Sequence, residues 1–188
     1  IIADLMGDGH VQDTPLRMRL DYTSKSVDEL NRFGKEVYTI FKIKGKIRKC
    51  TTNTYGTMNY GVNCRPMVRT LRLLGAPAGA KVLTKFSIPE WILNDKDLFA
   101  RFVNRLFSCE SSVDINSKCI EIQMYKSESL IEDGVNFFAQ IKSYLNEYFG
   151  IKTTNPFLDN NFNLRRDGIR TRPVRMKIKN MASLIKFR

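Results

Sequence analysis

The feature that most constrains this chain is a short apolar segment that ends on an acidic residue and recurs in the second half. The first copy covers residues 1–9, where Asp8 stands between two glycines, and the second covers residues 103–111 and ends at Glu110 and Ser111. In both copies the apolar residues have helical spacing and the carboxylate lies at the C-terminal end. A duplicated unit that carries one acid to each of two equivalent helix ends predicts a single site with paired carboxylates.

The length and the net charge of the chain limit the classes of protein to which it can belong. The 188 residues suit one domain, or two small repeats that share a core, and 43% hydrophobic residues are enough for a packed interior. The net charge of +12 favours a polyanionic partner, whose binding would weaken strongly with salt. A merely soluble basic protein would have the same charge, so charge alone leaves both interpretations open.

The cysteine spacing, the single histidine and the hydropathy argue against a zinc protein and against a membrane protein. Cys50, Cys64, Cys109 and Cys119 show no Cys-x-x-Cys spacing, and His10 is the single histidine, so we expect no zinc site and free thiols in a reducing compartment. No apolar run approaches the roughly 20 residues of a membrane span. We therefore expect a soluble intracellular protein, cytoplasmic and nucleoid-associated, or organellar if it is eukaryotic.

Periodicity in the first half predicts alternating helices and strands. Helical spacing runs from Val27 to Phe41 after Ser24 or Ser26 as N-cap, and again from Met67 to Leu74, before Gly75. Period-two alternation predicts strands over residues 16–22, 46–54 and 57–64.

The same order recurs in the second half. Helices are predicted over residues 95–109, with Asn94 or Asp95 as N-cap, and over 127–149, with a short terminal helix near Asn180. Strands are predicted over 119–125, 151–154 and 170–179, with a polar loop over 155–168, and Pro173 places the start of the last strand at an edge or entry position.

This repetition predicts an α+β fold with antiparallel sheets that are covered by helices on one face. We expect a single pseudo-symmetric domain over 1–188, made of a first repeat (1–85), a connector (86–94) and a second repeat (95–188).

One face of the predicted sheets is rich in cations and amides. The residues opposite the apolar side of their strands are Arg17, Arg19, Lys46, Arg48, Asn59, Gln123, Arg175, Lys177 and Lys179. With Arg170 and Arg172 at the start of the last strand, they form our candidate set for contacts to double-stranded DNA, because Lys and Arg neutralise phosphates while Arg, Asn and Gln read base edges. An ordinary solvated sheet face would show the same alternation.

These residues resemble the LAGLIDADG homing endonucleases of the monomeric, two-motif type. The first motif matches at Ala3, Leu5, Gly7, Asp8 and Gly9, and the second at Leu106, Phe107, Glu110 and Val113. The connection over residues 74–81 and 88–92 resembles that of archaeal and intein-related members. The resemblance covers essentially the whole chain.

The resemblance implies duplicated αββαββα repeats, with two saddle-shaped antiparallel sheets around two central motif helices. It also implies a monomer that hydrolyses phosphodiester bonds in double-stranded DNA at a specific site. Asp8 and Glu110 would face the scissile phosphates and hold Mg²⁺ or Mn²⁺, with Gly7 and Cys109 beside them. Lys81 would stabilise charge at the phosphate or polarise the attacking water.

There is a physical reason for a metal in such a site. Two close carboxylates repel each other, and helix C-termini carry partial negative charge, so both acids resist ionisation unless a cation lies between them. Hard divalent ions accept carboxylate, phosphate and water oxygens.

The chain departs from the family pattern at two positions of the second motif. Arg105 occupies a place that is usually small, and Ser111 replaces the final glycine, which matters if that position requires a positive φ. These departures favour a second interpretation: a catalytically inactive LAGLIDADG-fold protein that binds DNA as a regulator or intron RNA as a maturase. A third is an unrelated α+β domain in which Gly7-Asp8-Gly9 simply ends a helix.

Overall fold

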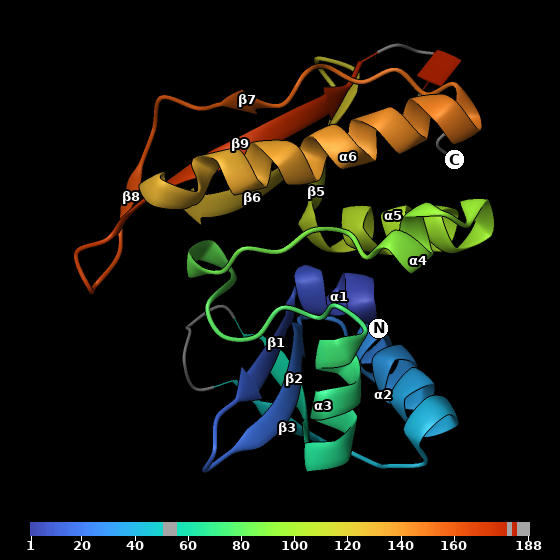
Figure 1. The fold of residues 1–188 in the computed structure, drawn as a ribbon, viewed down its shortest axis with the longest axis vertical. Coiled ribbons are helices and arrows are strands. Elements are labelled where there is room, and N and C mark those ends of the chain that lie inside the picture. Colours follow the sequence, from blue (N-terminus) through green and yellow to red (C-terminus); the bar gives the residue numbers. More distant parts are fainter. Residues whose placement is uncertain (51–55, 180–181, 184–188) are drawn as a thin grey trace. The chain divides into compact units, whose positions relative to one another are not determined.

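The computed structural model describes residues 1–50, 56–179 and 182–183. The chain forms two compact units, Ile1–Ala80 and Lys81–Arg188 (Figure 1). Each unit contains one antiparallel sheet with its own helices. The predicted α+β class with duplicated antiparallel sheets is therefore confirmed.

The first unit is built on a four-stranded sheet in the order β1-β2-β4-β3. Its elements in chain order are α1 (Ile2–Met6), β1 (Gly9–Asp13), β2 (Met18–Ser24), α2 (Val27–Phe41), β3 (Lys46–Lys49), β4 (Met58–Asn63) and α3 (Arg65–Leu73). Helix α2 begins as predicted, because the Ser26 hydroxyl accepts the Glu29 N–H at 3.4 Å. Helices α2 and α3 pack on the sheet, and Phe33 of α2 stacks on Tyr22 with ring centroids 4.5 Å apart.

The second unit is built on a five-stranded sheet in the order β5-β6-β9-β7, with β8 also paired to β9. Its elements are the 3₁₀ turn η1 (Lys81–Leu83), α4 (Glu90–Leu93), α5 (Lys96–Glu110), β5 (Ser111–Asp114), β6 (Cys119–Ser127), the 3₁₀ turn η2 (Glu128–Leu130), α6 (Ile131–Phe149), β7 (Phe157–Leu158), β8 (Asn163–Leu164) and β9 (Arg170–Ile178). Asp95 caps α5 as predicted, accepting the N–H groups of Asp97 and Leu98 at 2.9 Å. Helix α6 lies along β6 and β9 (Figure 1).

Several predicted elements differ from the structure. The strand expected over 151–154 is wrong: these residues form no strand, although Thr154 exchanges bonds with Lys177 of β9 through its backbone N–H and its hydroxyl. The loop over 155–168 contains the short strands β7 and β8, and these occupy that side of β9. The helix expected from residue 127 begins only at Ile131, after η2.

Pro173 marks neither a sheet edge nor the entry to the strand, because β9 is an interior strand that begins at Arg170. It pairs with Tyr125 of β6 on one side, and on the other side it falls between the residues paired to β7 and to β8. Its carbonyl there accepts the Asp159 N–H at 3.3 Å. A proline is tolerated because the ladder is already interrupted where its N–H is missing.

Strands β1 and β5, which directly follow the two motif copies, were not singled out from the sequence. The part of the predicted 46–54 strand after Cys50 and most of the predicted terminal helix lie outside the described residues, apart from 182–183, which are helical. In the described part of the chain, no helix combines the length and apolar character that crossing a membrane requires.

Candidate nucleic-acid interface and motif acids

The strand register gathers polar residues on one face of the first sheet. Alternate residues of a strand face opposite sides, and Leu20, Tyr22, Tyr60 and Val62 face the buried core. The residues of opposite parity form what we call the first outer face: His10, Gln12, Arg19, Asp21, Thr23, Lys46, Arg48, Asn59, Gly61 and Asn63. The predicted one-sided polar face is therefore present in the first unit.

Only some of the cations on the first outer face form ion pairs with a carboxylate. Arg19 binds Asp21 two residues along β2, with its Nη2 2.6 Å and its Nε 2.7 Å from Oδ1. Lys46 and Arg48 on β3 are exposed, and within the described residues neither has a carboxylate partner. Arg17 is exposed in the turn before β2, where its N–H donates to the Thr14 carbonyl at 3.1 Å. This face thus keeps cations that a phosphate backbone could neutralise.

The second sheet has an equivalent face, but its cations are matched by acids. The second outer face contains Glu121 and Gln123 of β6 opposite Lys177 and Arg175 of β9. Glu121 binds Arg175 at 3.0 Å and Lys177 at 2.6 Å, and Asp159 binds Arg175 at 2.8 Å. The hydrogen bond from Glu121 raises the pKa of Lys177. These acids were not among the predicted residues, although Glu121 shares the period-two parity of Gln123.

Three further predicted contact residues lie elsewhere. Arg170 and Arg172 share the parity of Val174, which is fully buried, so they lie on the opposite face from Arg175. Arg172 donates through Nη2 to the Asp159 carbonyl at 2.8 Å, and the Arg170 guanidinium lies 5.0 Å from the Phe162 ring centroid. Lys179 is exposed just after β9.

Asp8 lies where α1 passes into β1. Gly7 closes the helix by donating its N–H to the Ala3 carbonyl at 2.9 Å, and the exposed Asp8 follows. A Cβ at Gly9 would lie 2.8 Å from the Leu5 Cα and 2.9 Å from the Asp4 carbonyl oxygen. Glycine is therefore required here because the chain folds back tightly on the helix, and this holds the preceding carboxylate at the helix end.

Glu110 has the corresponding place in the second unit. It is the last residue of α5, it is half-buried beside Cys109, and Ser111 begins β5 directly after it. Ser111 has φ −103° and ψ 158°, ordinary extended geometry, so serine at this glycine position carries no backbone strain. Arg105 is half-buried one turn earlier on the same helix.

Lys81 belongs to the second unit and begins η1. It is half-buried, and its carbonyl accepts the Thr84 N–H at 3.3 Å and the Lys126 ammonium at 3.4 Å. The structure thus places Lys81 and Glu110 in one unit and Asp8 in the other.

The donors at the motif ends suit a hard divalent ion rather than zinc. Among the described residues, no group of three or more His, Cys, Asp or Glu side chains could hold a metal. Each motif end supplies one carboxylate, from Asp8 or Glu110, next to backbone carbonyls. Mg²⁺ is commonly bound by one or two carboxylates together with water and substrate phosphates, so these residues fit it.

Solved structures provide the comparison with known proteins. The chain is similar to mesophilic variants of the homing endonuclease I-DmoI, with a TM-score of 0.59 and 15% identity over 99% of this chain and 83% of that one. I-DmoI in complex with DNA and Mn gives a TM-score of 0.57 and 17% identity over 99% and 90%. Full-length DUF199/WhiA from Thermatoga maritima gives 0.56 and 14% over 99% of this chain, which spans 51% of WhiA.

No protein-family model matches the sequence, and no curated protein matches it. At 14–17% identity, the likeness to these structures shows the fold alone. The chain has the LAGLIDADG-type duplicated fold.

Proposed function

We propose that this chain is a site-specific endonuclease that hydrolyses phosphodiester bonds in double-stranded DNA with Mg²⁺ or Mn²⁺. The observation that carries the proposal is that each unit ends a motif helix on a carboxylate, Asp8 or Glu110, directly before the first strand of its sheet. The fold in which this occurs is shared with a homing endonuclease whose structures include a complex with DNA and Mn.

In this proposal Asp8 and Glu110 hold the metal, with the carbonyls of Gly7 and Cys109 beside them. Bound there, a divalent ion supplies a water of lowered pKa and neutralises charge on the leaving oxygen. A bound cation would offset the partial negative charge of the helix end beside each carboxylate. Lys81 offers a positive charge to the phosphate as charge develops on it.

The two outer faces bind the duplex in this proposal, and the protein acts as a monomer. On the first face, Lys46, Arg48 and the adjacent Arg17 neutralise phosphates, while Asn59 offers an amide to base edges. On the second face, Gln123 offers an amide, and Lys179 lies beyond the end of β9. Arg19, Arg175 and Lys177 are already ion-paired, so they contribute less to affinity unless DNA displaces their acids.

A catalytically inactive LAGLIDADG-fold protein that binds DNA as a regulator, or intron RNA as a maturase, is the second candidate. Two observations favour it: the acids Glu121 and Asp159 offset the cations of the second outer face, and Arg105 occupies a motif position that is usually small. The similar structures include a LAGLIDADG domain of WhiA as well as a homing endonuclease.

A cleavage experiment on a randomised duplex library with Mg²⁺, followed by sequencing of new ends, tests the proposal. We expect one enriched site, with ends that disappear in Asp8→Asn and in Glu110→Gln. Asp167→Asn is the matched control, because it removes the charge of an exposed acid that forms an ion pair with Arg165, two residues before it, at 3.0 Å. Salt-sensitive binding without new ends would contradict the endonuclease and support the inactive binding protein.

A further inference from the structure

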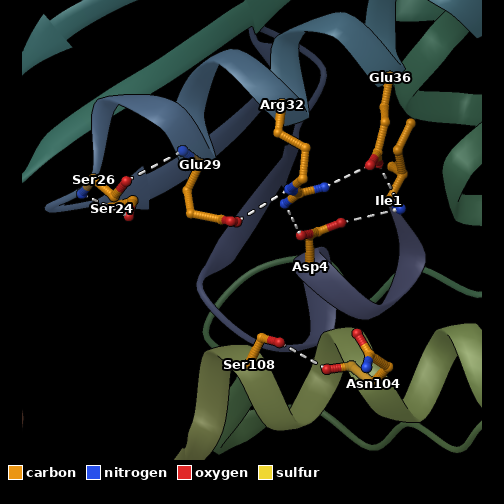
Figure 2. Close-up of polar contacts among 9 residues, drawn as sticks. All are labelled: Ile1, Asp4, Ser24, Ser26, Glu29, Arg32, Glu36, Asn104 and Ser108. Atoms are coloured by element: carbon orange, nitrogen blue, oxygen red, sulfur yellow. Dashed lines mark hydrogen bonds and ion pairs between the residues drawn. The ribbon is translucent and has the colours of Figure 1, made fainter.

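The first motif helix contains a buried acid that the proposed chemistry does not use. The Asp4 side chain is 0% exposed and lies in α1, one turn before Asp8. Figure 2 shows it between Arg32 and Ile1. Its Oδ1 accepts from Nη2 of Arg32 at 2.5 Å, and its Oδ2 lies 3.1 Å from the Ile1 nitrogen. A carboxylate removed from water is strongly unfavourable unless it is paired and hydrogen-bonded, so Arg32 makes this buried acid possible.

Arg32 is itself held firmly on helix α2. Its Nε binds Glu29 at 3.0 Å and its Nη1 binds Glu36 at 2.7 Å (Figure 2). Its guanidinium lies 5.8 Å from the Tyr22 ring centroid. Burial lowers the pKa of Arg32, but the carboxylates of Asp4 and Glu36 outweigh burial and raise it. The planar guanidinium binds three carboxylates at once, which the ammonium of a lysine does poorly.

Helix α1 depends on such contacts. All five residues of α1, Ile2–Met6, are buried, and the Asp4 carboxylate among them is bound by Arg32 of α2. The position of α1, and that of the carboxylate that follows it, is therefore set by the packing of its buried side chains and by the bond between Asp4 and Arg32.

The second motif has an apolar residue, not an acid, at the position that corresponds to Asp4. When Asp8 is aligned with Glu110, Asp4 falls on Leu106, which is also 0% exposed. A leucine at this position of α5 is buried without an ion partner, whereas the buried aspartate of α1 requires Arg32.

We propose that Arg32 is the positioning residue of the first motif: through Asp4 it holds α1 in place and thereby sets the position of the Asp8 carboxylate. The inference rests on the proposed function of Asp8 as a metal ligand. Arg32 acts through Asp4 and is not itself a ligand, so an apolar pair that packs in the same space should replace it.

The test compares Arg32→Met with the double variant Asp4→Leu/Arg32→Met, which copies the leucine of the second motif. The readout is the Mn²⁺ dissociation constant of each full-length chain, with Asp8→Asn as the reference for loss of the ligand. Arg165→Met is the matched control, since Arg165 pairs with an exposed acid in the other unit. Circular dichroism confirms that each variant is folded.

We expect Arg32→Met to weaken Mn²⁺ binding by roughly tenfold or more, as removal of a residue that orients a metal ligand typically does. The double variant should return to within a few-fold of wild type, because a well-packed apolar pair can replace a buried ion pair. Affinity for duplex DNA measured in EDTA should stay unchanged in both. A folded Arg32→Met chain with wild-type Mn²⁺ affinity, or a double variant as weak as Arg32→Met, would overturn the proposal.

If Arg32→Met does not fold, Arg32→Lys carries the test. It keeps the charge but loses the guanidinium fork, so we expect weaker Mn²⁺ binding, and unchanged binding overturns the inference. Failure of the proposed function looks different. A wild-type chain that binds Mn²⁺ through Asp8 but cuts no DNA contradicts the endonuclease and leaves the role of Arg32 intact.

Discussion

The two units share a fold but differ in where they place charge. In the first unit the buried charge is an acid on the motif helix, Asp4, while Lys46 and Arg48 on the outer face have no acid partner among the described residues. In the second unit the buried charge is a base on the sheet, Lys126, while Glu121 pairs with both cations of the outer face. The comparison shows that apolar periodicity specifies the fold, whereas the charges are arranged separately in each half.

Lys126 illustrates how the second unit uses its buried charge. Its side chain is 0% exposed on β6, and its ammonium binds Asp133 of α6 at 2.6 Å and the Thr84 carbonyl at 2.8 Å. It also lies 3.9 Å from the Phe86 ring centroid. One lysine thus ties the segment after η1 to both the sheet and the long helix of its unit.

The largest effect on stability is expected at this lysine. Lys126→Met should lower the free energy of unfolding by about 3 kcal/mol, because it leaves Asp133 and the Thr84 carbonyl without their buried partner. Denaturant unfolding of the full chain measures this. Lys35→Met, at an exposed position of α2, is the control and should change the value by less than about 0.5 kcal/mol. Equal effects of the two substitutions would contradict the role given to Lys126.

The pH dependence of stability should differ between wild type and Lys126→Met. Burial lowers the pKa of Lys126 in the folded protein, and Asp133 only partly offsets this. Between the lowered value and the ordinary value of 10.5, the unfolded state binds more protons, so the free energy of unfolding should rise with pH from this residue. Unfolding curves across this range should show the rise in wild type relative to Lys126→Met. The same slope in both proteins would contradict it.

A smaller effect is expected where the longest helix of each unit ends. Helix α2 ends at Lys42 with φ 58°, and α6 ends at Gly150 with φ 62°, both left-handed. Glycine adopts this conformation without strain, so Gly150→Ala should cost about 1 kcal/mol and Lys42→Gly should add up to about 1 kcal/mol. Thermal unfolding measures both changes. A loss of stability in Lys42→Gly would show that the Lys42 contact with the Tyr38 ring, at 5.9 Å, outweighs the backbone strain.

The sequence predicted elements where the signal is local. Ser26 and Asp95 cap their helices as expected, and the strands that carry Leu20, Val62 and Ile122 follow their alternation. The expected strand over 151–154 did not form: Thr154 does reach Lys177 of β9, but its side-chain hydroxyl accepts the Lys177 N–H that a ladder would pair with a backbone carbonyl. Periodicity does not report such a long-range side-chain contact.

The candidate site also has some features that local sequence patterns predict and others that only the folded structure reveals. The placement of Asp8 and Glu110 at motif-helix ends was predictable from the repeated pattern. Period-two parity also held the signal for Glu121, which lies on the same side of β6 as Gln123. The partnership of Asp4 with Arg32 joins residues on different helices, so only the folded structure reveals it.

The most direct test of the difference between the two units is the salt dependence of duplex binding. Each phosphate contact contributes a slope of about 0.9 in the plot of log affinity against log salt. We predict that Lys46→Ala/Arg48→Ala reduces the slope by about 2 and Arg175→Ala/Lys177→Ala by less than about 1, while Glu121→Gln steepens it by releasing cations on the second face. Equal losses from the two double variants, with no change in Glu121→Gln, would contradict the account.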